Sequence, residues 1–378
     1  MLNLIPRVHF PNEVVIKRGS LLRLKYLDSK RAFVIISKSI ESSNAYDKII
    51  SYLKDAKIES KIVADVSGDP TRDSVKKLAR VMLEFNPDII LGVGGGCILD
   101  NTKIARVLYE NNEEELSASL KNISVSYFDR KSKLILIPTT CGTGSEASTV
   151  AVVKDVNKPN KMPLVSDAFV PDVVILDPAL LLTLSPSTTA YTAIDALTHA
   201  IESYCSRLTN IFSESCAKIA AQEIVMNLER SIEKQVNLIF KEKLQIAAFN
   251  AGVAQNATSV GAVHAIAHAL GAHLGVPHGI ANSLVLGSVL NYNAKFSTKV
   301  EEFIKIIGFS DMSQFSEWLL KIRTLADLPS GWNFYCAPGK PVDLERIAQT
   351  ALEDICMKTN PKNLTLEDVV NILRDTKT

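Results

Sequence analysis

The sequence predicts two structural parts, an α/β domain built on a mostly parallel sheet and then an all-α domain. In the first half, short apolar runs alternate with stretches of helical period, as in strand–helix–strand units. Near-continuous apolar runs such as Ile89–Val93 are typical of strands that are buried on both faces of a sheet. From about Ser185 onward, long amphipathic patterns replace the strand signals, which predicts helices. The composition shifts near Leu184-Ser185-Pro186, so the predicted domains are residues 1–184 and 185–378.

Each predicted element follows from its own local pattern. β-branched and aliphatic residues predict strands at Phe33–Ile36, Ile62–Val66, Ile89–Val93, Leu134–Ile137 and Val173–Leu176. Helical periodicity predicts helices at Ser42–Lys54, Arg72–Phe85 and Ile98–Tyr109, and Pro70-Thr71 is a start signal for the second of them. The second half is expected to hold helices at Ser187–Tyr204, Ser213–Lys234, Leu244–Ala257, Val260–Leu274, Asn282–Phe296, Val300–Ile307, Met312–Ala326, Asp343–Met357 and Thr365–Thr376.

Charge and composition exclude several classes of protein. Among the 378 residues, 42 are Lys or Arg and 41 are Asp or Glu, so the net charge is +1. A balance this close to zero, with no basic tract, gives no electrostatic footprint for nucleic acid or for an anionic membrane. We find no signal-peptide pattern and no apolar run of about 18 residues, and the six cysteines are scattered without a CxxC pair. We therefore expect a cytoplasmic protein with reduced thiols that acts on a small molecule.

Two glycine-rich turns each follow a predicted strand. Gly92–Cys97 precedes a predicted helix, so backbone amides and the helix N-terminus could hold a phosphate. Alone, this turn is a moderate signal, and the alternative is a tight strand-to-helix connection that needs positive φ. The second turn, Pro138–Glu146, adds hydroxyl groups and further glycines. Two such turns at the same end of a parallel sheet favour a crevice that binds a nucleotide.

Acidic and histidine side chains in the second half are spaced for one metal site. Asp195 and His199 are four residues apart, as are His264 and His268, so each pair shares one helix face. His278 follows shortly afterwards. Each histidine alone is more often a core residue, and one Asp/His pair is a common helix salt bridge, but together they favour a metal. Three imidazoles and one carboxylate can coordinate Zn²⁺ or Fe²⁺ and leave a position open for water or substrate.

These motifs resemble those of the iron-containing (group III) alcohol dehydrogenase family. The similarity covers nearly the whole chain in the family's order and spacing, and it rests on GGGCILDNTK, PTTCGTGSE, AIDALTHAIE and GAVHAIAHALGAHLGVPHGIAN. Near the end, Thr359–Asn363 is similar to the family's C-terminal NPR region. The resemblance implies a Rossmann-like N-terminal domain and a dehydroquinate synthase-like helical C-terminal domain, and we expect the active site in the cleft between them.

The resemblance also implies roles for individual residues. The family's four metal-ligand positions are matched by Asp195, His199, His264 and His278, and Fe²⁺ is expected in preference to Zn²⁺. His268 matches an active-site histidine that is not a ligand but lies near the nicotinamide and the route of the proton, so we expect it to act in catalysis. The expected cofactor contacts are Gly95, Gly96 and Cys97 in the pyrophosphate loop, Asp100 in its DxxK continuation with Lys103, Thr139, Thr140 and Thr143 in the second turn, and Lys161 and Leu180 beyond it.

The sequence departs from the family pattern at three places. Cys97 replaces the usual Ser of the pyrophosphate loop, and Cys141 replaces a usual small residue, but neither change removes a glycine amide. After Phe33–Ile36, many family members carry an Asp that binds the adenosine ribose, whereas this chain has Ser37-Lys38. Ser37 is therefore an expected cofactor contact, and NADP is expected as a cofactor alongside NAD because both side chains could donate to a 2′-phosphate.

The combined prediction is a metal-dependent, NAD(P)-dependent alcohol dehydrogenase or aldehyde reductase. It would transfer a hydride between the nicotinamide and a small primary alcohol or aldehyde, and we expect it to form a homodimer. Dehydroquinate synthase-like and glycerol dehydrogenase-like enzymes of the same fold are alternatives. The former would need several Lys or Arg residues near the metal, whereas the nearest basic residue in the sequence is Arg207. A redox-inactive regulator that binds NAD is a further alternative, which the complete set of ligand residues disfavours.

Overall fold

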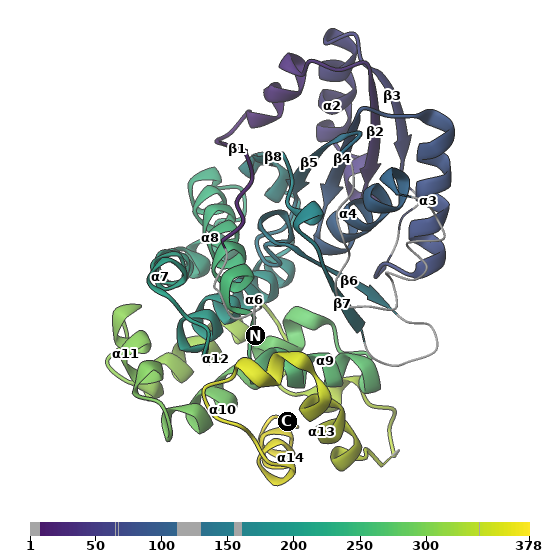
Figure 1. Cartoon of the computed structure of the whole chain (residues 1–378). Helices are drawn as coiled ribbons and strands as arrows, with labels where there is room; N and C mark the ends of the chain where they lie inside the picture. Colours follow the sequence, from purple (N-terminus) through teal and green to yellow (C-terminus); the bar gives the residue numbers. More distant parts are fainter. Residues whose placement is uncertain (1–7, 65, 67, 112–129, 155–160, 340) are drawn as a thin grey trace. The chain divides into compact units, whose positions relative to one another are not determined.

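The computed structural model describes residues 8–64, 66, 68–111, 130–154, 161–339 and 341–378, which divide into two compact units (Figure 1). The α/β unit consists of His9–Thr140 and Gly144–Thr183. The helical unit consists of Leu184–Thr378 together with Cys141–Thr143 and, at the start of the described chain, Val8. The predicted fold class, a parallel-sheet α/β part followed by a helical part, is confirmed.

The α/β unit is built on a six-stranded sheet in which every neighbouring pair of strands is parallel. The strand order is β1-β8-β5-β4-β2-β3. The strands are β1 (Glu13–Ile16), β2 (Arg31–Ile36), β3 (Glu59–Val63), β4 (Ile89–Gly94), β5 (Lys133–Pro138) and β8 (Val173–Leu176). The central strands are buried along nearly their whole length, as their near-continuous apolar sequences predict.

Two edge strands differ from the prediction. The predicted strand Ile62–Val66 is wrong in its bounds, because β3 begins at Glu59, where it pairs with Arg31 of β2. Its side chains are half-buried to exposed, so the strand contains polar residues that an apolar pattern does not detect. β1 is absent from the prediction for the same reason, since it is a short edge strand with no fully buried residue.

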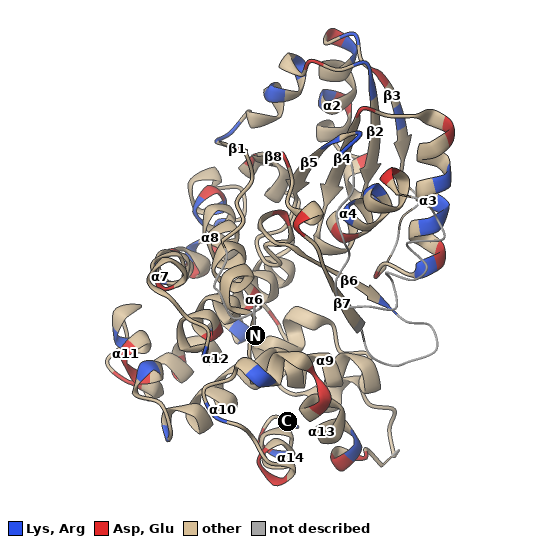
Figure 2. Ribbon diagram, in the orientation of Figure 1, with Lys and Arg blue, Asp and Glu red and all other residues tan. Residues whose placement is uncertain are grey.

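Helices α3 (Arg72–Phe85) and α4 (Gly96–Glu110) pack against one face of this sheet. The sheet presents alternate side chains to them, and the shared core contains Phe33, Ile35, Ile90, Leu134 and Leu136 from the strands and Leu78, Met82, Phe85, Leu99, Ala105 and Tyr109 from the helices. The predicted bounds of α3 are those observed, and its start is fixed by a capping box between Thr71 and Ser74. Its outer face carries both signs of charge (Figure 2).

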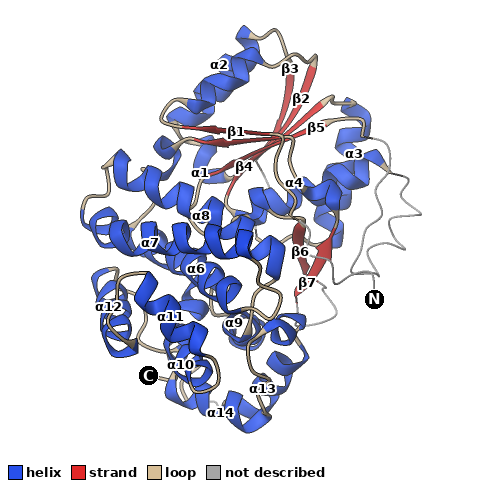
Figure 3. Cartoon of the chain, turned by 60° about the vertical axis from the view of Figure 1, so that its left-hand side comes forward, coloured by secondary structure: helices blue, strands red, loops and turns tan. Residues whose placement is uncertain are grey.

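The remaining helical elements of the α/β unit are shorter. They are η2 (Ser20–Tyr26), α1 (Lys38–Glu41), α2 (Asn44–Asp55), η3 (Ser145–Ala147), η4 (Asp167–Phe169) and η5 (Pro178–Leu181). An unpredicted hairpin of β6 (Val150–Lys154) and β7 (Lys161–Val165) forms a separate antiparallel sheet (Figure 3). Its buried residues Ala151, Val153 and Leu164 share a core with Val75 and Ile104 of the two large helices.

The helical unit is arranged around α6 (Pro186–Cys205), which is buried along most of its length and contacts α7, α8 and α10. The other helices are α7 (Ile211–Glu233), α8 (Leu238–Thr258), α9 (Ala262–Leu274), α10 (His278–Ala294), α11 (Thr298–Ile306), α12 (Met312–Leu325), η6 (Trp332–Tyr335), α13 (Leu344–Glu353), η7 (Ile355–Thr359) and α14 (Leu366–Asp375). Among the described residues, no helix combines the length and the apolar character needed to cross a membrane.

Three of the predicted helices of this unit need correction. The helix expected at Leu244–Ala257 begins earlier, because α8 starts at Leu238, directly after its cap residue Asn237. The helix expected at Asn282–Phe296 begins at His278, so His278 lies on α10 rather than before it. The single helix expected at Asp343–Met357 is wrong, because α13 ends at Glu353 and a 3-10 turn follows. Asp354 causes this break: its backbone is extended at φ −66° and ψ 135°, and its carboxylate accepts the backbone N–H of Cys356.

Candidate functional site

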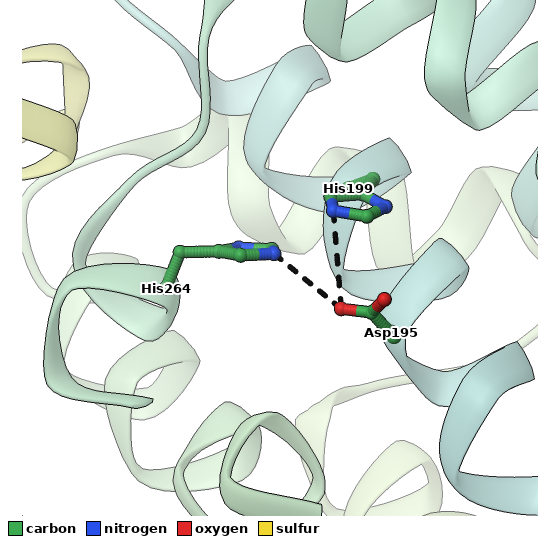
Figure 4. Close-up of side chains that lie close together, drawn as sticks. All are labelled: Asp195, His199 and His264. Carbon is green, nitrogen blue, oxygen red and sulfur yellow. Dashed lines mark ion pairs between the residues drawn. The ribbon is translucent and has the colours of Figure 1, made fainter. Parts of the chain in front are cut away.

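Three histidine side chains of the helical unit converge on one carboxylate oxygen of Asp195. Asp195 Oδ1 lies 3.8 Å from His199 Nε2, 3.5 Å from His264 Nε2 and 3.5 Å from His278 Nε2. Asp195 and His199 come from adjacent turns of α6, whereas the other two histidines come from α9 and α10. Figure 4 shows His199 and His264 directed at Asp195 from two helices. The structure therefore brings the four predicted metal ligands together.

Burial makes this cluster electrostatically unusual. Asp195, His199 and His264 are almost fully buried, and the His278 side chain is 31% exposed. Burial alone would raise the pKa of Asp195, but the three histidines hold it well below its usual range. Burial lowers the pKa of His199 to about 4, against the opposing effect of Asp195. The cluster thus offers an ionised carboxylate and a neutral imidazole, which are the forms that bind a divalent metal ion.

His264 has a second acidic partner, Glu202, which sequence reasoning missed. Glu202 Oε2 lies 2.5 Å from His264 Nδ1, and its Oε1 accepts the backbone N–H of Val263 at 2.7 Å. Burial lowers the pKa of His264, but Glu202 and Asp195 more than offset this and raise it to about 9. Its position seven residues after Asp195, which places both on the same face of the helix, is the signal that could have identified Glu202.

Asn282 on α10 is a second residue that sequence reasoning missed. Its Nδ2 lies 2.6 Å from Asp195 Oδ1 and 3.3 Å from both His264 Nε2 and His278 Nε2. Its Oδ1 is buried and has no hydrogen-bond partner among the described residues. Asn282 follows His278 by four residues, so both lie on the same face of α10.

These donors fit a divalent metal ion. Donor atoms that share one ion are about 3 to 3.5 Å apart when each lies about 2.1 Å from it. The separations from Asp195 Oδ1 are close to this range and are longer than ordinary hydrogen bonds. One carboxylate and three imidazoles also match the ligand preferences of Fe²⁺ and Zn²⁺.

His268 belongs to a neighbouring cluster rather than to this set. Its ring stacks on that of His278 with centroids 5.1 Å apart, while its Nδ1 lies 2.8 Å from Asp354 Oδ2. The other carboxylate oxygen of Asp354 is fixed by the backbone of Cys356, as described above. Burial alone would raise the pKa of Asp354, but the contact with His268 holds it well below its usual range. With Nδ1 engaged and the side chain 28% exposed, His268 has Nε2 left for another partner.

The residues expected to bind the dinucleotide lie at the carboxyl ends of the central strands. Gly95 caps α4 and Gly96 begins it, directly after β4. Thr139 follows β5, and its N–H donates to the Gly94 carbonyl at 3.0 Å. Ser37 follows β2, and its N–H donates to the Val93 carbonyl at 3.1 Å. Backbone hydrogen bonds thus join the two glycine-rich turns and Ser37 at the carboxyl ends of the strands.

Two glycines of the first turn are required by packing. A Cβ atom at Gly92 would lie 2.6 Å from Thr102 Oγ1, and one at Gly94 would lie 2.6 Å from Ile98. At Gly95 the nearest atom, Thr140 Cγ2, would be 3.3 Å away. None of the glycines in this turn has a positive φ, so a connection that needs positive φ does not explain them. Close packing explains Gly92 and Gly94, whereas Gly95 is less constrained by its neighbours.

Asp100 and Lys103 hold the second turn and the hairpin in place. Asp100 Oδ1 accepts the Ser145 hydroxyl at 2.6 Å, and its Oδ2 accepts the Val152 N–H at 2.9 Å. Lys103 is fully buried, and its Nζ donates to the carbonyls of Ser148 and Val150 at 3.0 Å. Burial lowers the pKa of Lys103 to about 8. Both side chains are therefore engaged in bonds within the protein.

The remaining predicted contacts are dispersed. Cys97 is exposed on the first turn of α4, and its Sγ lies 3.4 Å from Asp69 Oδ1. Thr143 accepts a hydrogen bond from Gln255 Nε2 through its carbonyl at 2.9 Å, and Leu180 is buried in η5. Lys161 is the first residue of β7, and its side chain lies outside the described part of the structure.

A parallel sheet with two glycine-rich turns, and a helical unit with three histidines around one aspartate, define a metal-dependent dehydrogenase. A sequence model of iron-containing alcohol dehydrogenases matches residues 11–178, and one for the C-terminal part of Fe-containing alcohol dehydrogenases matches residues 189–377. The chain therefore belongs to the iron-containing alcohol dehydrogenase family, and the predicted class of enzyme, an NAD(P)-dependent alcohol dehydrogenase, is confirmed.

Individual relatives are similar over almost the whole chain. An NADPH-dependent butanol dehydrogenase from Clostridium saccharobutylicum is 31% identical, over 97% of this chain and 96% of its own length. A 1-propanol dehydrogenase from Citrobacter freundii is also 31% identical, over 91% of this chain and 92% of its own. The solved structure of an alcohol dehydrogenase from Oenococcus oeni aligns with a TM-score of 0.88 at 26% identity, covering 98% of this chain and 100% of that one.

Proposed function

We propose that this enzyme interconverts a small primary alcohol and its aldehyde with NADP(H) or NAD(H). The observation that carries the proposal is the convergence of three imidazoles on the buried carboxylate of Asp195. Relatives that are named for butanol and 1-propanol support short aliphatic alcohols as substrates, and the NADPH dependence of the butanol dehydrogenase supports NADP. The charge-neutral composition is consistent with a small substrate rather than a polymer.

Asp195, His199, His264 and His278 would hold a divalent ion, Fe²⁺ in preference to Zn²⁺. When bound, the ion supplies a Lewis acid for the alcohol or carbonyl oxygen, and the nicotinamide carries the hydride. The chain's own contribution is to fix these donors through buried contacts from three helices. His268, held at Nδ1 by Asp354, would give or accept the substrate proton at Nε2.

The α/β unit would bind the dinucleotide. We propose that residues 1–184 form the dinucleotide-binding domain and residues 185–378 the metal and substrate domain. Gly95, Gly96 and Cys97 would receive the pyrophosphate at the N-terminus of α4, where helix amides point outward. Ser37 would lie at the adenosine ribose, and the further contacts would come from Thr139, Thr140, Thr143, Lys161 and Leu180. Asp100 would act mainly through Ser145 and Val152, which it already binds.

We also propose that the enzyme works as a homodimer in the cytoplasm. Free thiols at all six cysteines support a reducing compartment. The dehydroquinate synthase-like alternative gains no support, because the guanidinium of Arg207 donates to the Pro361 carbonyl instead of adding a cation to the cluster.

The test is to load the purified protein with Fe²⁺ or Zn²⁺ and to measure oxidation of NADH and NADPH with a panel of short aldehydes. We expect turnover with unbranched aldehydes that is lost after chelation of the metal and is restored by adding it back. A protein that binds metal and dinucleotide but turns over none of these aldehydes would contradict the proposed reaction.

A further inference from the structure

We propose that Glu202 is a positioning residue that selects the tautomer of His264. It would hold the hydrogen on Nδ1, so that the lone pair of Nε2 faces Asp195 and the proposed metal ion. The inference rests on the proposed function, because it gives His264 the role of a ligand. It concerns a residue that touches neither the proposed ion nor the substrate.

The geometry of Glu202 leaves little freedom. Its two carboxylate oxygens bind consecutive parts of α9: Oε1 accepts the Val263 N–H at 2.7 Å, and Oε2 lies 2.5 Å from His264 Nδ1. The Glu202 side chain is 5% exposed and that of His264 is 3% exposed, so water does not compete for these bonds. An ionised carboxylate can only accept hydrogen bonds, and Nδ1 must therefore be the donor.

The opposite side of the His264 ring agrees with this assignment. His264 Nε2 lies 3.5 Å from Asp195 Oδ1 and 3.3 Å from Asn282 Nδ2. The amide nitrogen of Asn282 is a donor, so a lone pair on His264 Nε2 would accept from it. A histidine that donates one ring N–H to a carboxylate presents the other nitrogen to a metal in a fixed orientation.

The start of α9 depends on the same carboxylate. α9 has no side-chain cap of its own, because Gly261 stands at its N-cap position. Glu202 takes the Val263 N–H and Asn360 Oδ1 takes the Ala262 N–H at 3.2 Å. A Cβ atom at Gly261 would lie 2.9 Å from Glu202 Oε1 and 3.1 Å from Asn360 Oδ1, so glycine allows both side chains to approach. Glu202 therefore fixes both the helix that carries His264 and the ring itself.

The variant Glu202→Gln tests whether Glu202 selects the tautomer or only fills space. Glutamine has nearly the same shape but offers one acceptor oxygen for two donors. If its oxygen takes the Val263 N–H, its amide group faces Nδ1 as a donor and favours the tautomer with the hydrogen on Nε2. That tautomer cannot bind a metal through Nε2 until the hydrogen is moved. We expect the Zn²⁺ affinity, measured by competition with a chelator, to fall about 10- to 100-fold.

Asn360→Ala is the matched control. It removes the other acceptor at the start of α9 but does not touch the His264 ring. We expect it to lower the unfolding temperature while leaving the Zn²⁺ affinity within about threefold of wild type, which is small on the free-energy scale of metal binding. An equal loss of affinity in both variants would mean that Glu202 acts only by stabilising the helix, and would overturn the proposal.

The tautomer can be observed directly by ¹⁵N NMR of histidine-labelled protein, both metal-free and loaded with Zn²⁺. The His264 signals are assigned by their absence from His264→Ala. The metal-free spectra are recorded above pH 9, where the His264 ring is neutral. We expect the hydrogen on Nδ1 in the wild type, with and without Zn²⁺, and a shift toward Nε2 in metal-free Glu202→Gln. A wild-type His264 with its hydrogen on Nε2 would overturn the proposal even if Glu202→Gln did not fold. By contrast, full Zn²⁺ binding by His264→Ala would reject the proposed ligand set and hence the function on which this inference rests.

Discussion

His268 and Asp354, which are 86 residues apart in the chain, are joined by a hydrogen bond of 2.8 Å between Nδ1 and Oδ2. The carboxylate is itself fixed by the Cys356 N–H at 2.8 Å. These two hydrogen bonds orient the His268 ring beside the proposed metal ligands without making it one of them. This arrangement supports the proposed role of His268 in proton transfer rather than in metal binding.

We expect His268→Ala to keep its metal and lose rate. Metal content should match wild type, whereas kcat should fall by about 10²-fold, a typical loss when a general acid–base group is removed. Asp354→Asn should lose less, because it leaves the imidazole in place but offers Nδ1 a different partner. Metal analysis and steady-state kinetics on the same preparations provide the test. Loss of the metal from His268→Ala would show that His268 is a ligand.

Removal of a proposed metal ligand should differ from His268→Ala, because it should cost the protein its metal. His264→Ala and His278→Ala should lose both metal and activity while the circular dichroism spectrum stays native, because the fold has its own apolar core around α6. His273→Ala is the matched control, since His273 lies on α9 but bonds Thr350 at 2.8 Å instead of Asp195. A fully metal-loaded His278→Ala protein would remove that residue from the ligand set.

The residues after β2 predict acceptance of NADPH. Ser37 Oγ lies 3.0 Å from Ser39 Oγ, so two hydroxyl groups stand directly after β2. A carboxylate would repel a 2′-phosphate, whereas hydroxyl groups and Lys38 can donate to it. Comparison of kcat/KM for the two cofactors tests this, and Ser37→Asp should shift the preference toward NADH. A wild-type ratio above about 100 in favour of NADH would contradict the prediction, because it corresponds to nearly 3 kcal/mol of discrimination.

Cys97 should be the most reactive thiol. It is exposed at the start of α4, where a helix N-terminus favours a thiolate, although the neighbouring Asp69 carboxylate opposes this effect. Burial raises the pKa of Cys205 to about 12, and it also raises the pKa values of Cys216, Cys336 and Cys356.

Mass-spectrometric mapping of thiol labelling with and without NADP tests this prediction. Labelling at Cys97 should be fastest and should be slowed by NADP, and the modification should block cofactor binding. Cys97→Ser should stay active, because it restores the residue that is usual in the family. Labelling at Cys97 that does not respond to NADP would mean that this thiol serves only as a small residue.

Glu146 should make stability depend on pH. It is buried beside Lys103, its Oε2 has no partner among the described residues, and burial raises its pKa from 4.5 to about 7. As the pH rises from 4.5 to 7, the unfolded chain releases this proton before the folded chain does, so the wild type loses stability in that window.

Glu146→Gln should remove this dependence. Relative to wild type, its free energy of unfolding should be unchanged near pH 4 and should gain up to about 3 kcal/mol at pH 7. Denaturant unfolding at several pH values measures the difference, and Glu84→Gln, on the exposed face of α3, should show none. A gain of equal size at every pH would point to packing instead of ionisation.

The sequence predicted the helices and strands whose buried residues form an unbroken apolar run or recur at the helical period. The bounds of α3 and β8 were recovered because caps and apolar runs mark them in the sequence. The hairpin of β6 and β7 was missed because its short strands mix buried and half-buried residues. The break at Asp354 was missed because the helical pattern continues across it, and the local cap of Asp354 on the Cys356 N–H was not recognised in the sequence.

In the site, too, residues paired along one helix were predicted, and residues that matter through contacts between helices were not. Helical spacing and resemblance indicated Asp195 and the histidines, since pairs on one helix face are visible in the sequence. Glu202 and Asn282 were not found, because their importance comes from contacts between different helices. Asp100 stays a predicted cofactor contact, but its bonds to Ser145 and Val152 were not predicted, because these partners lie about 50 residues further along the chain.

The uncapped start of α9 bears on how the enzyme matures during synthesis. The Ala262 N–H is bound by Asn360, which is synthesised 98 residues later. At ordinary elongation rates this delay is roughly 5 to 20 seconds. Until then, the segment that carries His264 lacks one of its two anchors. The start of α9 should therefore become stable only when the chain is almost complete, so the last step in folding this helix follows the synthesis of all four proposed ligands.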